Sequence, residues 1–118
     1  MGDELSMTDG EALALAEMFR LMGDASRLKI ILACLDRPTC VSDIAHRTKL
    51  SQSLVSHHLR LLRAARVLRA QRQGKQVFYA AADAHIRRVI TDMVAHAGES
   101  PNMPGDAPTD ARDLPDVA

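Results

Sequence analysis

The sequence predicts a mainly α-helical domain that carries one β-hairpin. Apolar residues recur at helical spacing in five stretches of the 118-residue chain, each preceded by Thr, Asp or Ser at the position of an N-terminal cap. Between the fourth and fifth stretches, two extended runs flank Gln73-Gly74, which is typical of a two-residue hairpin. A short third helix and a three-residue connection precede the fourth helix, so the order predicts a winged helix-turn-helix.

The first two helices have clear sequence boundaries. Thr8 and Glu11 form the pattern of a capping box at the start of the first helix. The following stretch, "ALALAEMFRLM", has apolar residues on most sides, so we expect this helix to be buried against a substantial surface. Gly23 ends it, Asp24 caps the second helix, "ASRLKIILACL", and Pro38 stops that helix.

The third and fourth helices form the helix-turn-helix. Thr39 is expected to cap the short third helix, "CVSDIAHRT", and Ser51 to cap the fourth, "QSLVSHHLRLLRAA". In the fourth helix, three leucines are expected to face the core: Leu54, Leu59 and Leu62. Val55 is compatible with either the core or the outer surface.

The end of the chain differs in composition from the rest. Asp83 is expected to cap the last helix, which Gly98 and Pro101 close. Residues 101–118 hold four of the five prolines and four acids against one Arg, too little apolar surface to order a segment. We therefore predict three parts: a flexible N-terminus (1–8), a winged helix-turn-helix domain for DNA binding and dimerisation (9–99) and a disordered acidic, proline-rich tail (100–118).

Composition excludes several classes of protein. The chain has no run of eighteen apolar residues, and its acidic start lacks the features of a signal peptide, so we expect no membrane partner. Two cysteines are too few for a disulfide framework, which predicts a reducing cytoplasm. Because so short a chain buries a modest fraction of its surface, we expect an obligate dimer.

The charges are segregated although the net charge is zero. No Asp or Glu lies between Ile44 and Ala82. The same segment contains eight basic residues: Arg47, Lys49, Arg60, Arg63, Arg66, Arg69, Arg72 and Lys75. Solvated surfaces usually interleave both signs, so we interpret this acid-free segment as a footprint for double-stranded DNA.

The fourth helix is the expected recognition helix, because such a helix presents its N-terminal turns to base edges in the major groove. The predicted base-contacting residues are Gln52, Ser53, Val55, Ser56 and His57. Arg60 and Arg63 are expected to reach phosphates. The hairpin is expected to add backbone or minor-groove contacts from Arg69, Arg72, Gln73 and Lys75.

The segment "LSQSLVSHHLRLLRAARVLRAQRQGKQVFYAAAD" closely resembles the ArsR/SmtB family of bacterial metal-responsive repressors. The resemblance runs from about Met18 to Glu99, and its most specific parts are "SQSLVSHHLRLL", the wing "RQGKQVFY" and the final helix. It implies a homodimer whose first and last helices form the interface. It also implies repression at an inverted-repeat operator, with release when an inducer binds.

The final helix, "DAHIRRVITDMVAH", carries His85 and His96 eleven residues apart. Eleven steps of about 100° return to within roughly 20° of one direction, yet separate the rings by about 16 Å along the axis. Side chains that share one zinc ion have Cα atoms at most about 13 Å apart. One straight helix therefore cannot unite the two histidines, whereas two copies packed antiparallel across a dyad can.

Two carboxylates extend this predicted metal site. Asp83 lies two residues before His85, and Glu99 follows His96 by three. Each of two symmetric sites would combine both chains: Asp83 and His85 from one, His96 and Glu99 from the other. This donor set suits Zn(II), with Co(II) or Ni(II) as alternatives, and it matches the family's final-helix zinc site position by position. If Gly98 frays the helix, water replaces Glu99.

The family's second metal site is expected to be vestigial. Cys40 and Asp43 occupy its positions near the third helix, but residues 1–33 contain no His or Cys to complete it. Cys34 is interpreted as a core residue.

Three other functions compete with metal sensing. A repressor of the same fold could respond to thiol chemistry through Cys34 and Cys40. A protein-interaction module is disfavoured by the acid-free segment. An enzyme is not expected, because no nucleophile–base pair or open metal site stands out, and neither is a small organic substrate.

Overall fold

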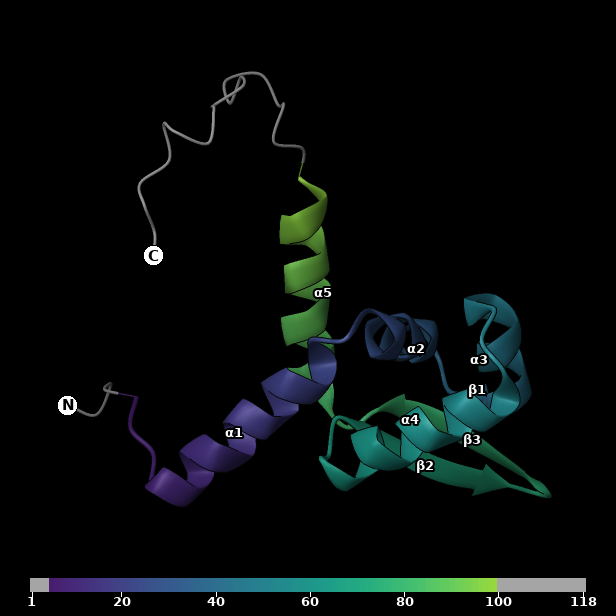
Figure 1. Ribbon diagram of the computed structural model, residues 1–118, viewed down its shortest axis with the longest axis horizontal. Helices are drawn as coiled ribbons and strands as arrows, with labels where there is room; N and C mark the ends of the chain where they lie inside the picture. The colour runs from purple at the N-terminus through teal and green to yellow at the C-terminus, as the bar shows by residue number, and fades with distance from the viewer. Residues whose placement is uncertain (1–4, 100–118) are drawn as a thin grey trace. The chain divides into compact units, whose positions relative to one another are not determined.

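The computed structural model describes residues 5–99. Its elements, in chain order, are α1 (Asp9–Met22), α2 (Ala25–Leu35), β1 (Thr39–Cys40), α3 (Val41–Thr48), α4 (Gln52–Ala64), β2 (Leu68–Gln73), β3 (Gln76–Ala81) and α5 (Ala84–Gly98) (Figure 1). The predicted order of helices and hairpin is confirmed, with β1 as an addition. Residues 1–4 and the predicted tail, 100–118, lie outside the described residues. The chain forms two compact units, with the boundary between Arg87 and Arg88.

Four predicted helix caps are present. The Thr8 hydroxyl accepts the Glu11 N–H at 3.0 Å, and the Glu11 carboxylate accepts the Thr8 N–H at 2.9 Å, which completes the capping box. Asp24 accepts the N–H of Arg27 at 3.0 Å, and Ser51 accepts that of Leu54 at 3.1 Å. At the start of α5, Asp83 accepts the N–H of Ile86 at 2.9 Å. These bonds satisfy N–H groups that a helix start leaves without an internal partner.

The predicted cap at Thr39 is wrong. Helix α3 begins after Cys40, which makes no side-chain capping bond. Thr39 instead pairs with Tyr79 in the antiparallel β1–β3 ladder. Its buried hydroxyl lies 3.1 Å from the carbonyl oxygen of Ala33 and 2.9 Å from that of Arg37. Thr39 is therefore held in extended backbone and ties the sheet to the end of α2.

The described sheet has the strand order β1-β3-β2. Gln73 pairs with Gln76, so the two-residue loop is Gly74-Lys75, one residue later than predicted. Gly74 has φ +66°, a value that glycine adopts without the steric cost met by other residues. The register follows from this glycine, because the first position of the loop needs the positive φ.

The core lies between α2, α3, α4 and the base of the hairpin. Its fully buried large side chains are Ile30, Ile31, Ile44, Val55, Leu59, Leu62, Val67 and Leu68. Val55 is 0% exposed, whereas Leu54 is 39% exposed, so the prediction that Leu54 faces inward is wrong. Val55, Leu59 and Leu62 form one stripe at helical spacing, and Leu54 lies about 100° around the helix from Val55.

Helix α1 is exposed in the single chain, so its predicted burial against a substantial surface stays a prediction. Leu21 is its one buried residue, whereas Leu13 is 73% and Phe19 57% exposed. The apolar faces of this helix therefore lack a cover within the described part of the chain. In the same range, no helix is long and apolar enough to cross a membrane.

Candidate nucleic-acid interface and metal-ligand positions

The N-terminal turns of α4 carry most of the predicted base-reading side chains on the surface. Gln52, Ser53 and His57 are exposed, and Ser56 is half-buried. Val55 is the exception, because its side chain is completely buried between α4 and the core. A buried side chain cannot meet a thymine methyl, so the assignment of Val55 as a base contact is corrected.

Leu54 is the exposed apolar residue in these turns and was missed as a surface residue. Leu54 is 39% exposed, next to Ser53 in the chain, so its side chain is not committed to the core. Helical spacing contained the signal, since only one of Leu54 and Val55 can align with Leu59 and Leu62.

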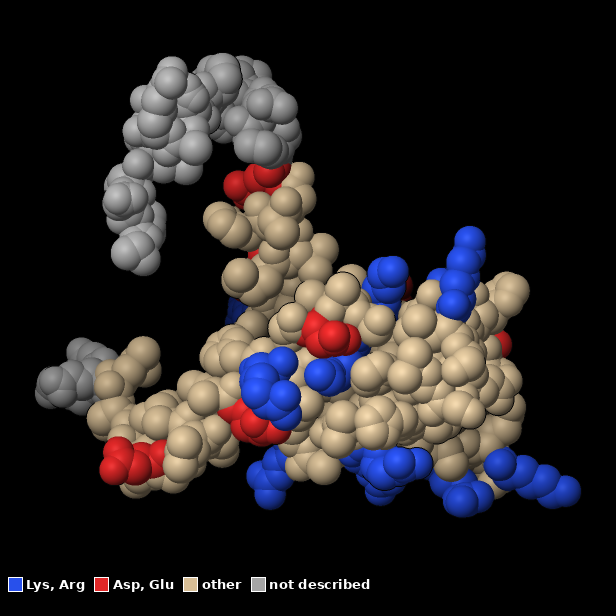
Figure 2. All heavy atoms as spheres, in the orientation of Figure 1, with Lys and Arg blue, Asp and Glu red and all other residues tan. Residues whose placement is uncertain are grey.

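Within the described residues, the basic side chains of the acid-free segment have no acidic partner within 4.0 Å. All the predicted phosphate-contacting and wing residues are exposed: Arg60, Arg63, Arg69, Arg72, Gln73 and Lys75. Across residues 5–99, ion pairs within 4.0 Å join only Arg20 to Glu17 and His85 to Asp83. Figure 2 shows Lys and Arg without Asp or Glu along the lower edge below α4, β2 and β3. This face has the charge that a nucleic-acid backbone requires.

Arg66 was not among the predicted contacts, yet it borders a hollow with Arg63 and Arg69. It has a left-handed backbone, φ +64°, directly after α4. Arginine recurs every third residue from Arg60 to Arg72, which was the available sequence signal. The rim of the same hollow includes Asp83.

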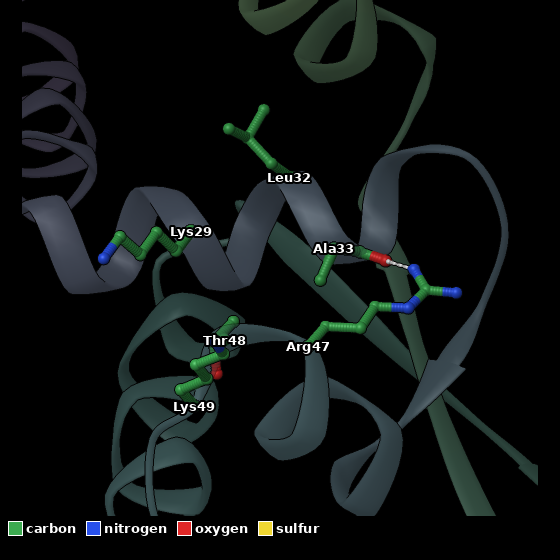
Figure 3. Close-up of a pocket in the computed structure, with 6 residues that line it drawn as sticks. All are labelled: Lys29, Leu32, Ala33, Arg47, Thr48 and Lys49. Carbon is green, nitrogen blue, oxygen red and sulfur yellow. Dashed lines mark hydrogen bonds between the residues drawn. The ribbon is translucent and has the colours of Figure 1, made fainter.

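A second hollow lies between α2 and α3 (Figure 3). Its lining residues are Lys29, Leu32, Ala33, Arg47, Thr48 and Lys49. Arg47 does not project freely into solvent, because its Nη1 donates to the carbonyl oxygen of Ala33 at 3.2 Å. Arg47 therefore joins α3, the first helix of the helix-turn-helix, to the end of α2.

Two predicted metal ligands come together at the start of α5. The Asp83 Oδ2 atom lies 3.7 Å from His85 Nδ1, while Asp83 Oδ1 accepts the Ile86 N–H. This backbone hydrogen bond is the main cause that lowers the pKa of Asp83, and the His85 ring adds to it. The carboxylate is therefore ionised at neutral pH, as metal ligation requires.

The other two predicted ligands are exposed at the far end of α5. The helix ends at Gly98, and Glu99 follows it with its N–H donating to the His96 carbonyl oxygen at 3.1 Å. Among residues 5–99 of one chain, no three His, Cys, Asp or Glu side chains are grouped to hold a metal ion.

The two cysteines are both free and buried. Burial raises the pKa of the Cys34 thiol to about 12, so this thiol stays protonated and poorly nucleophilic at neutral pH. Cys40 Sγ lies 3.4 Å from the Ser42 hydroxyl oxygen. The burial of both thiols gives no support to a thiol sensor.

Known proteins resemble this chain in sequence and in fold. Residues 24–70 match the family described as bacterial regulatory protein, arsR family. A transcriptional repressor SmtB homolog from Synechocystis is 37% identical over 94 residues, which cover 80% of this chain and 71% of that protein. The chain belongs to the ArsR family. A cadmium resistance transcriptional regulatory protein CadC homolog from Staphylococcus aureus is 32% identical over 85 residues, covering 71% of this chain and 70% of that relative.

A solved member of the fold gives the same architecture. The homodimeric winged helix-turn-helix domain of a possible ArsR-family regulator from Mycobacterium bovis superposes with a TM-score of 0.77 at 19% identity. The superposition covers 88% of this chain and 96% of that domain. This ArsR-family chain is therefore a DNA-binding transcriptional regulator with a winged helix-turn-helix, and the prediction that it is not an enzyme is confirmed by its family.

Proposed function

We propose that this ArsR-family regulator represses transcription as a homodimer on an inverted-repeat operator and is released by Zn(II), with Co(II) or Ni(II) as alternatives. The observation that carries this proposal is the pair of Asp83 and His85, exposed and 3.7 Å apart at the start of α5. His96 follows on the same face of that helix, too far along it to join them within one chain.

The two exposed helices support a dimer. Large apolar side chains are exposed on α1, at Leu13, Leu15 and Phe19, and on α5, at Val89, Met93 and Val94. Water contact with such faces is unfavourable, and a second copy of the chain would cover them. The related Mycobacterium bovis domain is homodimeric.

The proposed ligands are Asp83 and His85 of one protomer with His96 and Glu99 of its partner. These residues fit a zinc ion, because carboxylate oxygens and imidazole nitrogens are among its usual ligands. The His85 side chain is 95% and that of Asp83 57% exposed, so neither must leave the core to bind. Asp83 Oδ1 is occupied by the Ile86 N–H, which leaves Oδ2 as the ligating atom.

Repression would require the two α4 helices to sit at half-site spacing, about 34 Å or one turn of DNA. A bound divalent ion would supply a bridge between the two α5 helices. His85 and His96 must be neutral to accept it, so the response weakens in acid. Release requires that the liganded dimer has the conformation with lower DNA affinity, and a coupling of about 1–3 kcal/mol is typical of allosteric proteins.

The test is a titration of Zn(II) into the protein bound to a fluorescent duplex, selected from random DNA by the metal-free protein. Anisotropy should fall for the wild type, whereas His96→Ala should bind DNA normally and stay bound. His46→Ala removes an exposed imidazole from α3 instead and should retain the zinc response. Wild-type operator affinity that is indifferent to Zn(II), Co(II) and Ni(II) would falsify the proposal.

A further inference from the structure

The C-terminal end of α2 receives hydrogen bonds from two arginines of different helices. The last four carbonyl groups of a helix have no donor inside it. Arg47 of α3 donates to the Ala33 oxygen at 3.2 Å (Figure 3), and Arg87 of α5 donates to the Leu35 oxygen. Both guanidinium groups therefore bond carbonyls that have no donor within the helix, that of Ala33 together with the Thr39 hydroxyl, and place positive charge at the negative end of the α2 dipole.

These arginines belong to the two functional parts of the chain. Arg47 lies on the first helix of the helix-turn-helix, directly before the turn that leads to α4. Arg87 lies in the first turn of α5, four residues after Asp83 and two after His85. The end of α2 is thus the place where the DNA-reading helices and the start of the proposed sensor helix contact the same main chain.

Asp83 makes two hydrogen bonds to the backbone of the turn that carries Arg87. Its carboxylate accepts the Ile86 N–H at 2.9 Å, and its carbonyl oxygen accepts the Arg87 N–H at 3.2 Å. A ligand bound at Oδ2 pulls on the same carboxylate that holds the Ile86 N–H through Oδ1, and this pull shifts the turn that holds the second bond. Such a shift moves the Arg87 side chain and alters its hydrogen bond to the Leu35 carbonyl oxygen.

We propose that Arg87 is a positioning residue that couples the Asp83–His85 pair to the helix-turn-helix through the C-terminal end of α2, where Arg47 is the receiving contact. This inference rests on the proposed metal response. It concerns transmission alone, since Arg87 neither binds the ion nor touches DNA.

The experiment compares wild type, Arg87→Ala, Arg87→Lys and the neighbouring control Arg88→Ala. For each we would measure zinc affinity against a chromophoric chelator and operator affinity with and without Zn(II). Arg87→Ala should keep zinc affinity and metal-free operator affinity within about threefold of wild type. The factor by which zinc lowers operator affinity should shrink about tenfold or more, which is most of the coupling in a typical allosteric protein. Arg87→Lys keeps the charge and one donor and should retain part of the effect, whereas Arg88→Ala should match wild type.

A measurement without metal separates this inference from the proposed function. In metal-free Arg87→Ala, or in Arg87→Lys if the alanine variant does not fold, amide hydrogen exchange should accelerate at the end of α2 and also in α3, residues 41–48. Acceleration confined to α5, or an unchanged zinc effect on DNA affinity, overturns the role of Arg87. A third outcome separates the two proposals. If Zn(II) leaves the operator affinity of the wild type unchanged but Arg87→Ala still accelerates amide exchange in α3, the metal response is refuted. The contact between Arg87 and the helix-turn-helix through the end of α2 then stands.

Discussion

Separate replacements of Val55 and Leu54 should have different effects: the first should lower the stability of the fold, and the second should lower operator affinity. Val55→Ala removes two methyl groups from a side chain that is 0% exposed. At about 0.8 kcal/mol for each, plus about 1 kcal/mol for the cavity, the free energy of unfolding should fall by about 2–3 kcal/mol. For a domain of this size, that loss lowers Tm by about 10–20 °C.

Leu54→Ala removes more carbon from a side chain that is 39% exposed, so its cost in stability should be about 0.5–1 kcal/mol. Its effect should appear on DNA, where loss of one apolar contact of about 1 kcal/mol weakens operator binding about fivefold.

Both variants are measured by circular dichroism at one protein concentration, because the Tm of a dimer depends on concentration. Operator affinity is then measured well below either Tm. If Val55→Ala kept the wild-type Tm and lost operator affinity, Val55 would be a base contact and the buried placement of its side chain would be wrong.

Three further outcomes follow from charge and burial. Arg60→Ala should reduce the slope of log K against log salt by about 0.9, whereas Arg20→Ala, on an arginine paired with Glu17 at 2.7 Å, should leave the slope unchanged; equal slopes would remove Arg60 from the footprint. Burial raises the pKa of Cys34 to about 12, so iodoacetamide at neutral pH should leave this thiol unmodified in the native protein. After unfolding, mass spectrometry should show Cys34 labelled. The folded pKa of Asp83 is lowered, so its capping contribution is present above the unfolded pKa of about 3.9 and is lost as the pH falls through the folded value. Asp83→Ala should thus lower Tm at neutral pH but not in strong acid, and a Tm difference that persisted there would exclude the ionised cap.

Local signals in the sequence predicted most of the secondary structure. The caps at Thr8, Asp24, Ser51 and Asp83 depend on side chains that bond within three residues, and no distant contact displaces them in the structure. Thr39 failed for the opposite reason. Its capping preference was overridden by pairing with Tyr79, forty residues away, and by carbonyl groups at the end of α2.

The candidate sites divide in the same way. The charge of the recognition surface is a property of composition, because a segment without acids remains basic however it folds. The choice between Leu54 and Val55 was open to the sequence through the helical spacing to Leu59 and Leu62, and the core of the folded chain shows that Val55 is the buried one.

By itself, the sequence determined the helix starts, the acid-free segment and the eleven-residue histidine spacing, because each depends on residues near one another in the chain. Only the tertiary structure decided the β1 pairing and the meeting of Arg47 and Arg87 at the end of α2. Arg87 and Leu35 are 52 residues apart, and no helical or strand period relates them. Contacts of that kind arise only when the whole chain has packed.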